Sequence, residues 1–224
     1  MTKPVLCVTT SHPVKGKSGA PTGVYLAELT HPLEVLENAG FKTVIASVRG
    51  GQPPIDGFDL SDPVNAEYWH NKGLYERLAN TPALGELNGA DYAAVFFAGG
   101  HGTMWDFADS ADVQRIIREV YESGGVVAAV CHGPAALVNA KLSNGEYLVN
   151  GKNVAAFTNA EEEAVQATDI VPFLLQTALE NHGAKHHAAP NWSDNVMVDE
   201  RLITGQNPAS AKTVGVKMVE ALQK

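Results

Sequence analysis

The feature that most constrains this chain is an apolar segment at residues 124–137, with the sequence GGVVAAVCHGPAAL. Its core, residues 126–130, contains only small and β-branched residues, which is typical of a parallel strand buried on both faces. Gly133 permits a sharp reversal of the backbone, and Pro134 has the fixed φ that suits the first turn of a helix. The segment therefore predicts a strand, a tight elbow with Cys131 on it, and a helix.

Cys131 admits two interpretations. On such an elbow its thiol lies near unpaired backbone N–H groups and the positive end of a helix dipole, which favour the thiolate and would lower its pKa below the usual value of about 8.5. A kinked backbone can also swing the side chain of His132 towards the sulfur as a proton carrier. However, a lone cysteine after an apolar strand is commonly a buried packing residue. The local pattern alone supports catalysis and packing equally.

Composition limits the classes of partner. Of the 224 residues, 45% are hydrophobic and 18% charged, so the chain can bury one substantial core, and we expect a single domain over residues 1–224. Apolar runs are far too short to span a bilayer, and no signal-peptide core follows Met1, so we expect a cytoplasmic protein with no membrane partner. A formal net charge of −9 without a basic cluster argues against nucleic acid and favours a small molecule. Cys7 and Cys131 form no C-x-x-C pair and are expected as free thiols.

Strands and helices alternate along the chain. Apolar runs predict further strands at 5–9, 41–48 and 91–98. Capped or amphipathic segments predict helices, the clearest of them at 30–39, 110–123, 170–181 and 209–222. This alternation predicts a three-layer α/β/α sandwich with a mostly parallel central sheet. Residues 147–157, with Asn150-Gly151 between two apolar runs, predict an additional small β-hairpin.

A second glycine elbow, residues 99–102 with the sequence GGHG, ends the strand at 91–98. In a parallel β-loop-α-β unit this elbow faces the first one. Its glycines permit the backbone N–H groups to turn inward, so the amides of Gly100 and His132 can form an oxyanion hole, although a plain tight turn explains the glycines equally well. His101 is more typical of a loop histidine than of a ligand.

Metal and cofactor motifs are weak in this sequence. His186 and His187 are adjacent, but they lack a third ligand at metal spacing. We therefore predict no metal and no cofactor.

The two elbows together, residues 97–102 and 129–134, resemble the PfpI-like superfamily within the class I glutamine amidotransferase-like fold, which is flavodoxin-like. The resemblance runs nearly end to end. Residues 103–106, 156–162 and 205–210 are further similar to the branch of this superfamily that contains heat-shock chaperones and glyoxalase III.

The resemblance implies a catalytic triad in which Cys131 is the nucleophile, His132 the base, and Glu162 the acid that orients the imidazole. Glu161 is the alternative acid, because family members often have a glycine at that position and the register can shift by one. Without the resemblance, a glutamate run at a helix start is typical of solvated capping charge. We accordingly expect replacement of Glu161 by glutamine to leave activity near that of the wild type.

The resemblance also assigns a role to Glu28, which by default is a surface helix residue. In the resembled site this carboxyl is buried, keeps its proton and donates a hydrogen bond to the sulfur, as desolvation favours.

The implied activity is that of a glutathione-independent glyoxalase, a lyase that converts methylglyoxal and water to lactate through a hemithioacetal on Cys131. Deglycation of proteins or nucleotides and a chaperone activity are related expectations, so glycated or unfolded proteins are expected partners beside a small 2-oxoaldehyde. We expect a monomer or homodimer.

A cysteine amidohydrolase or peptidase is the first alternative function, although the His-x-Glu pair of true amidotransferases is missing downstream of the cysteine. A non-enzymatic holdase or redox sensor is the second.

Overall fold

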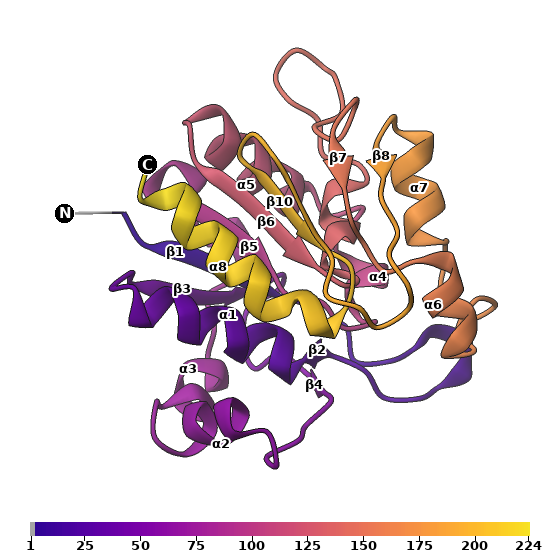
Figure 1. The fold of residues 1–224 in the computed structure, drawn as a ribbon. Coiled ribbons are helices and arrows are strands. Elements are labelled where there is room, and N and C mark those ends of the chain that lie inside the picture. The colour runs from indigo at the N-terminus through magenta and orange to yellow at the C-terminus, as the bar shows by residue number, and fades with distance from the viewer. Residues whose placement is uncertain (1–2) are drawn as a thin grey trace.

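A six-stranded sheet forms the centre of the computed structural model, which describes residues 3–224 (Figure 1). In spatial order its strands are β3 (Thr43–Ser47), β1 (Val5–Thr9), β5 (Ala94–Phe97), β6 (Val126–Val130), β10 (Leu202–Gly205) and β9 (Val196–Asp199). The first five are mutually parallel, and only β9 runs antiparallel to its neighbour. The predicted mostly parallel α/β sheet is confirmed.

Helices cover both faces of this sheet. They are α1 (Leu26–Asn38), α2 (Pro63–His70), α3 (Leu74–Ala79), α4 (Thr103–Asp106), α5 (Ala111–Glu122), α6 (Asn159–Ala164), α7 (Leu175–Asn181) and α8 (Ala211–Leu222). In the view of Figure 1, α1 and α8 pack against each other in front of the sheet, and α5 lies behind it. Short 3₁₀ helices occupy Gly16–Ser18, Leu84–Glu86, Gly89–Asp91, Gly133–Leu137 and Pro208–Ser210. No helix within residues 3–224 is long and apolar enough to cross a membrane.

The burial of the central elements follows from their sequence. Every residue of β1, β5 and β6 is buried, as their uninterrupted apolar runs predict for strands covered on both faces. In α5 the Ser110 hydroxyl accepts a hydrogen bond from the Val113 N–H, which begins the helix. The buried residues of α5 are the predicted stripe of Val113, Ile116, Ile117, Val120 and Tyr121.

The predicted hairpin at residues 147–157 is wrong. Asn150-Gly151 does turn the chain, but β7 (Asn153–Val154) pairs in parallel with β8 (Lys185–His186) instead of folding back on residues 147–149. The Gly151 N–H donates to the carbonyl of Gly183, and a Cβ at Gly183 would meet the Asn150 side chain, so the turn is committed to the loop after α7. The hairpin that does form joins β9 to β10.

Two predicted helix boundaries also change. The segment after the Cys131 elbow is a short 3₁₀ helix, Gly133–Leu137, and not the predicted α-helix, so its dipole is smaller than the sequence predicts. The first long helix begins at Leu26 and contains Pro32, whereas the sequence predicts a start at Thr30. The earlier start brings Glu28 into the first turn of α1. β2 (Val24–Tyr25) directly precedes that turn and pairs in parallel with β4 (Ile55–Asp56).

Candidate active site

Cys131 follows β6 directly and has a φ of 60°, in the left-handed region that side chains other than glycine rarely adopt. Two backbone hydrogen bonds hold it there: the Cys131 N–H donates to the Gly205 carbonyl over 2.9 Å, and its carbonyl accepts from the Phe157 N–H over 3.0 Å. A Cβ at Gly133 would lie 2.3 Å from the Phe97 carbonyl oxygen, so only glycine fits after the elbow. The strand, the elbow and the neighbouring strands together force the thiol into one position.

The His132 ring lies between the thiol and a carboxylate. Its Nδ1 is 3.5 Å from the Cys131 sulfur, and its Nε2 is 2.7 Å from Oε2 of Glu162. Because an ionised carboxylate only accepts, Nε2 carries the proton and Nδ1 presents its lone pair to the sulfur. His132 and Glu162 are almost completely buried, and the Phe157 ring covers the imidazole at a centroid distance of 4.2 Å. The structure therefore brings the three expected triad residues together.

His101, for which the sequence predicts an ordinary loop position, is part of this cluster. Its Nε2 is 2.7 Å from Oε1 of Glu162, and its ring centroid lies 4.1 Å from that of His132. It follows β5, the neighbour of β6, so both histidines emerge at the same edge of the sheet. The signal that could have identified it is its place in the second glycine elbow.

Hydrogen bonding sets the charges of the cluster. Burial opposes ionisation of Glu162, but hydrogen bonds from His101 and His132 outweigh it and lower its pKa to about 2. Burial, together with the nearby His101, lowers the pKa of His132 to about 4, although Glu162 acts in the opposite direction. At neutral pH the site consequently holds a carboxylate and a neutral imidazole that is free to accept a proton.

Glu161 and Glu162 point to different parts of the molecule. The Thr158 hydroxyl begins α6 by accepting from the Glu161 N–H, and the Glu161 side chain in turn accepts a hydrogen bond from the Thr158 N–H. The other oxygen of Glu161 accepts from the Trp192 N–H and from the side chains of Gln206 and Asn207. Glu161 therefore does not contact the triad. The expectation that it is a solvated capping charge is wrong, because it is completely buried.

Glu28 is also completely buried, as the resemblance implies, and the default expectation of a surface helix residue is wrong. Its carboxyl lies against the Gly99 backbone and the Cys131 side chain: a Cβ at Gly99 would be 2.1 Å from Oε2. Burial raises the pKa of Glu28 to about 8, while its polar neighbours Cys131 and Gly99 act to lower it. Neither oxygen makes a hydrogen bond of regular geometry to the protein. The carboxyl is thus protonated at neutral pH and is a donor within reach of the sulfur.

The expected low pKa of Cys131 is not found. Burial raises the pKa of its thiol, and a negative charge on Glu28 would raise it further, whereas the His132 amide lowers it. The elbow alone therefore does not produce a resting thiolate. Loss of the thiol proton has to be coupled to its acceptance by a neighbouring base, and His132 is the base in contact.

A cavity of about 340 Å³ opens above the sulfur. The side chains of Phe157, Val165, Trp192 and Tyr25 contribute apolar surface to the cavity, and those of Lys15, Asp56 and Glu28 contribute polar groups.

Gly100, with a φ of 106°, also lines the cavity. A Cβ at this position would clash with the Gly23 carbonyl, so the glycine permits the close approach of this loop. The amides of Gly100 and His132 make no backbone hydrogen bond in the described chain, which leaves them able to bind an anion near the sulfur.

One set of atoms in the site has the chemistry of metal ligands. A nitrogen of His101, a nitrogen of His132 and an oxygen of Glu162 lie within 4.8 Å of one another. Each of these side chains is engaged in the 2.7 Å hydrogen bonds described above, so an ion would have to replace both bonds.

Comparison with known proteins places this geometry in context. Residues 20–221 match the DJ-1/PfpI family. The glutathione-independent glyoxalase HSP31 of Saccharomyces cerevisiae is 34% identical, with 99% of this chain and 98% of the relative covered. Glyoxalase 3 of Candida albicans is 31% identical, with 100% and 99% covered.

Solved structures show the same similarity in three dimensions. The 24 kDa Rapid Encystment Protein of Francisella tularensis superposes with a TM-score of 0.95 at 40% identity, over 99% of both chains. Glyoxalase III of Candida albicans superposes with a TM-score of 0.91 at 31% identity, over 98% of this chain and 97% of that one.

Proposed function

The chain belongs to the DJ-1/PfpI family, and from this membership and the geometry around Cys131 we propose that it is a glutathione-independent glyoxalase. It is a lyase that converts methylglyoxal, a small 2-oxoaldehyde, and water to lactate. One observation carries the proposal: a thiol, a neutral imidazole and a carboxylate form a continuous chain of contacts on the floor of a cavity. Full-length relatives named as glyoxalases support it.

The first step is addition of sulfur to the aldehyde carbon. As the C–S bond forms, the thiol proton passes to Nδ1 of His132, which supplies the base that the raised pKa of the thiol requires. Glu162 stabilises the imidazolium that results. The aldehyde oxygen becomes an oxyanion near the amides of Gly100 and His132, and it takes the proton from the imidazolium to give a neutral hemithioacetal.

The second step moves hydrogen between the two carbons. His132, neutral again, removes the proton from the former aldehyde carbon and returns it to the former ketone carbon. The hydroxyl proton of the hemithioacetal passes to the former ketone oxygen, so the first carbon is oxidised and the second reduced. The product is a thioester of Cys131. Water hydrolyses this ester, the C–S bond breaks, and lactate leaves with the thiol restored.

Glu28 acts in this scheme by keeping its proton. A second negative charge beside the sulfur would oppose formation of the thiolate, whereas a protonated carboxyl can donate to it. Burial of the carboxyl supplies the reason for its protonation.

The test is incubation of the purified protein with methylglyoxal in the absence of glutathione and in the presence of a chelator. We expect lactate from the wild type and none from Cys131→Ala. His132→Ala should be nearly as inactive, because residues that act as one unit are strongly non-additive. Cys7→Ala is the matched control, since Cys7 lies in β1, away from the cavity, and its replacement should leave the reaction in place.

The same assay in heavy water tests the second step. A proton moved by His132 exchanges with solvent, so lactate should contain deuterium on the carbon that bears the hydroxyl. Lactate without solvent deuterium would indicate direct hydride migration and remove His132 from the role of base. Absence of lactate, with hydrolysis of glutamine or peptides in its place, would favour the amidohydrolase alternative.

A further inference from the structure

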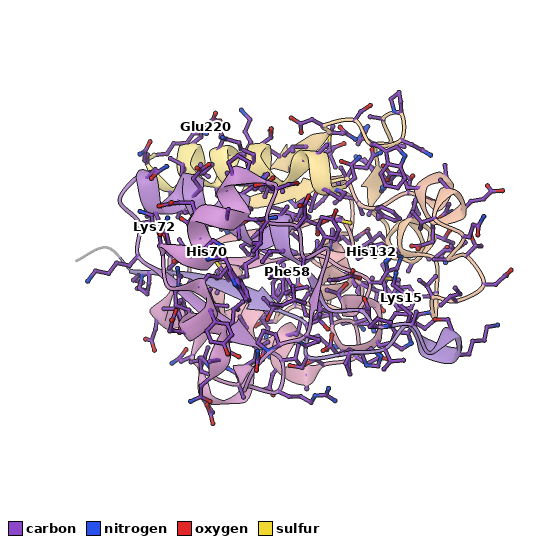
Figure 2. All side chains as sticks on the ribbon, turned by 90° about the horizontal axis from the view of Figure 1, so that it is seen from below. Lys15, Phe58, His70, Lys72, His132 and Glu220 are labelled. Carbon is purple, nitrogen blue, oxygen red and sulfur yellow. The ribbon has the colours of Figure 1, made fainter. Side chains whose placement is uncertain are left out.

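A lysine lines the cavity, and no step of the proposed reaction uses it. Lys15 lines the same cavity as Cys131 and His132. In the view of Figure 2, Lys15 and His132 lie near each other. The positive charge of Lys15 is close enough to be one of the influences that lower the pKa of His132. A substrate as small and neutral as methylglyoxal gives this ammonium group no partner.

The backbone holds Lys15 in place. Its N–H donates to the Ala20 carbonyl over 2.8 Å, and its carbonyl accepts from both the N–H and the hydroxyl of Ser18. The next residue, Gly16, packs closely on the Trp105 ring, where a Cβ would lie 2.9 Å from Cζ2. The loop therefore presents the lysine stem to the cavity from a fixed base, and Lys15 is partly buried where the neighbouring Lys17 is exposed.

No acidic group of residues 3–224 neutralises Lys15 by an ion pair within 4 Å. Three carboxyl groups lie in or beside the cavity. Glu28 is protonated at neutral pH, and Glu162 is bound by two histidines. Asp56 accepts from the Gly57 N–H and the Thr22 hydroxyl. Lys15 is thus a cation on a protein of net charge −9 that faces a cavity without a committed counter-ion.

The size of the cavity points in the same direction. About 340 Å³ is within the range of pockets that bind ligands much larger than methylglyoxal. Phe157 and Trp192 provide an apolar wall that suits a short methylene chain. A ligand with a reactive carbonyl at one end, methylene groups in the middle and an anion at the other end would match all three features. The carbonyl would react with the Cys131 sulfur, the methylene groups would pack on the apolar wall, and the anion would pair with Lys15.

We propose that Lys15 makes this enzyme selective for 2-oxoaldehydes that carry a carboxylate at the end remote from the aldehyde. The inference rests on the proposed glyoxalase function and specifies its substrate class. The chemistry is unchanged: the aldehyde carbon is oxidised to a new carboxylate, the adjacent ketone carbon is reduced to a carbinol, one water is consumed, and the remote carboxylate does not react. A substrate of this class, 4,5-dioxopentanoate, would give 2-hydroxyglutarate.

The experiment compares kcat/KM for 4,5-dioxopentanoate with that for 2-oxohexanal, a neutral substrate of similar length. We expect the wild type to prefer the anionic substrate, and Lys15→Met to reduce the ratio of the two values about tenfold, as loss of a charge-assisted contact predicts. The ratio should also fall with rising ionic strength, because salt screens the attraction. The ratio removes any common effect of the substitution on His132.

Lys17→Met is the matched control, because this lysine is on the same loop, exposed and outside the cavity lining, and its replacement should leave the ratio unchanged. Two results would overturn the proposal: no preference of the wild type for the anionic substrate, or an equal loss of both substrates in Lys15→Met.

A measurement without turnover separates this inference from the proposed function. Protection of Cys131 from iodoacetamide by 2-hydroxyglutarate should exceed protection by 2-hydroxyhexanoate, and Lys15→Met should abolish the difference. Protection that depends on Lys15, in a protein that converts no 2-oxoaldehyde, would retain the anion site and reject the glyoxalase. Conversion of methylglyoxal without selective protection would retain the glyoxalase and reject the anion site.

Discussion

At the scale of single residues, Cys131 and Glu28 share a buried space in which two negative charges would repel each other. Their side chains are neighbours, and burial raises the pKa of both. One of the two therefore keeps its proton while the other reacts. The proposed mechanism requires the proton to stay on Glu28.

Replacement of Glu28 by glutamine tests whether Glu28 keeps its proton while Cys131 reacts. Glutamine keeps the shape and a donor, so Glu28→Gln should retain more activity than Glu28→Ala, which removes the donor and leaves a hole. If alanine and glutamine have equal activity, Glu28 is not a neutral donor.

The same variant has a stability signature. In the folded protein Glu28 titrates near pH 8, above the ordinary value of about 4.3 for an unfolded chain, so the folded state binds more protons between these values. The stability contribution of Glu28 is thus complete below about pH 4.3 and is lost as pH rises towards 8. Relative to Glu28→Gln, the wild type should lose up to roughly 1.4 kcal/mol per pH unit in that window. Urea unfolding at several pH values measures the difference, and parallel curves would contradict it.

His101 is a positioning residue, because it acts on His132 through Glu162. Replacement by leucine removes one of the two hydrogen bonds to Glu162 and an influence that lowers the pKa of His132. His132 should then become protonated at a higher pH, so the acid limb of the pH–kcat profile should move upward while kcat falls about tenfold. His101→Asn can still donate and should recover part of kcat.

A distant histidine provides the control for this profile. His31 forms a comparable pair with Asp62, and His31→Leu should leave the acid limb unchanged. An unchanged profile in His101→Leu would show that His101 only fills space.

At the scale of elements, the first turn of α6 joins several loops through one side chain. Glu161 accepts from Thr158 at the start of its own helix, from the Trp192 N–H, and from Gln206 and Asn207 after β10. Trp192 has a φ of 65° and lines the cavity, so this carboxylate holds part of the cavity wall.

Glu161→Gln should consequently be strongly destabilising. The glutamine NH₂ cannot accept, so buried donors lose their partner, at a cost of roughly 2–4 kcal/mol in the free energy of unfolding. Urea unfolding measures it, with the exposed Glu163→Gln as a control that should change stability by less than about 0.5 kcal/mol. Equal stability of the two variants would contradict the structural role of Glu161.

At the scale of the whole molecule, the two thiols report on different events. Cys7 is buried in β1 between two strands of the sheet, and burial raises its pKa to about 12. Cys131 is in contact with the cavity. Under native conditions iodoacetamide should therefore modify Cys131 and spare Cys7, and Cys7 should react only as the protein unfolds.

Mass mapping of labelled peptides across a urea titration tests this expectation. Modification of Cys7 should follow the unfolding transition, and Cys131→Ala should leave Cys7 protected in the native protein. Labelling of Cys7 at low urea, at a rate similar to that of Cys131, would show that the sheet opens locally.

Local properties of the sequence determined much of this protein. The apolar run at 126–130, the stripe of α5 and the glycines at both elbows predicted the parallel sheet and the edge where the cavity lies, because burial on two faces and sharp turns restrict which residues can occupy those positions. Tertiary structure decided the charge state of the site, which no local pattern of residues determines. Burial of Glu28 and Glu161, the bridge from His101 to Glu162, and the direction of the Cys131 pKa depend on atoms that meet from distant segments. The missing hairpin has the same cause: the turn at Asn150-Gly151 forms, but its contacts with Gly183 and the pairing of β7 with β8 determine which segments become neighbours.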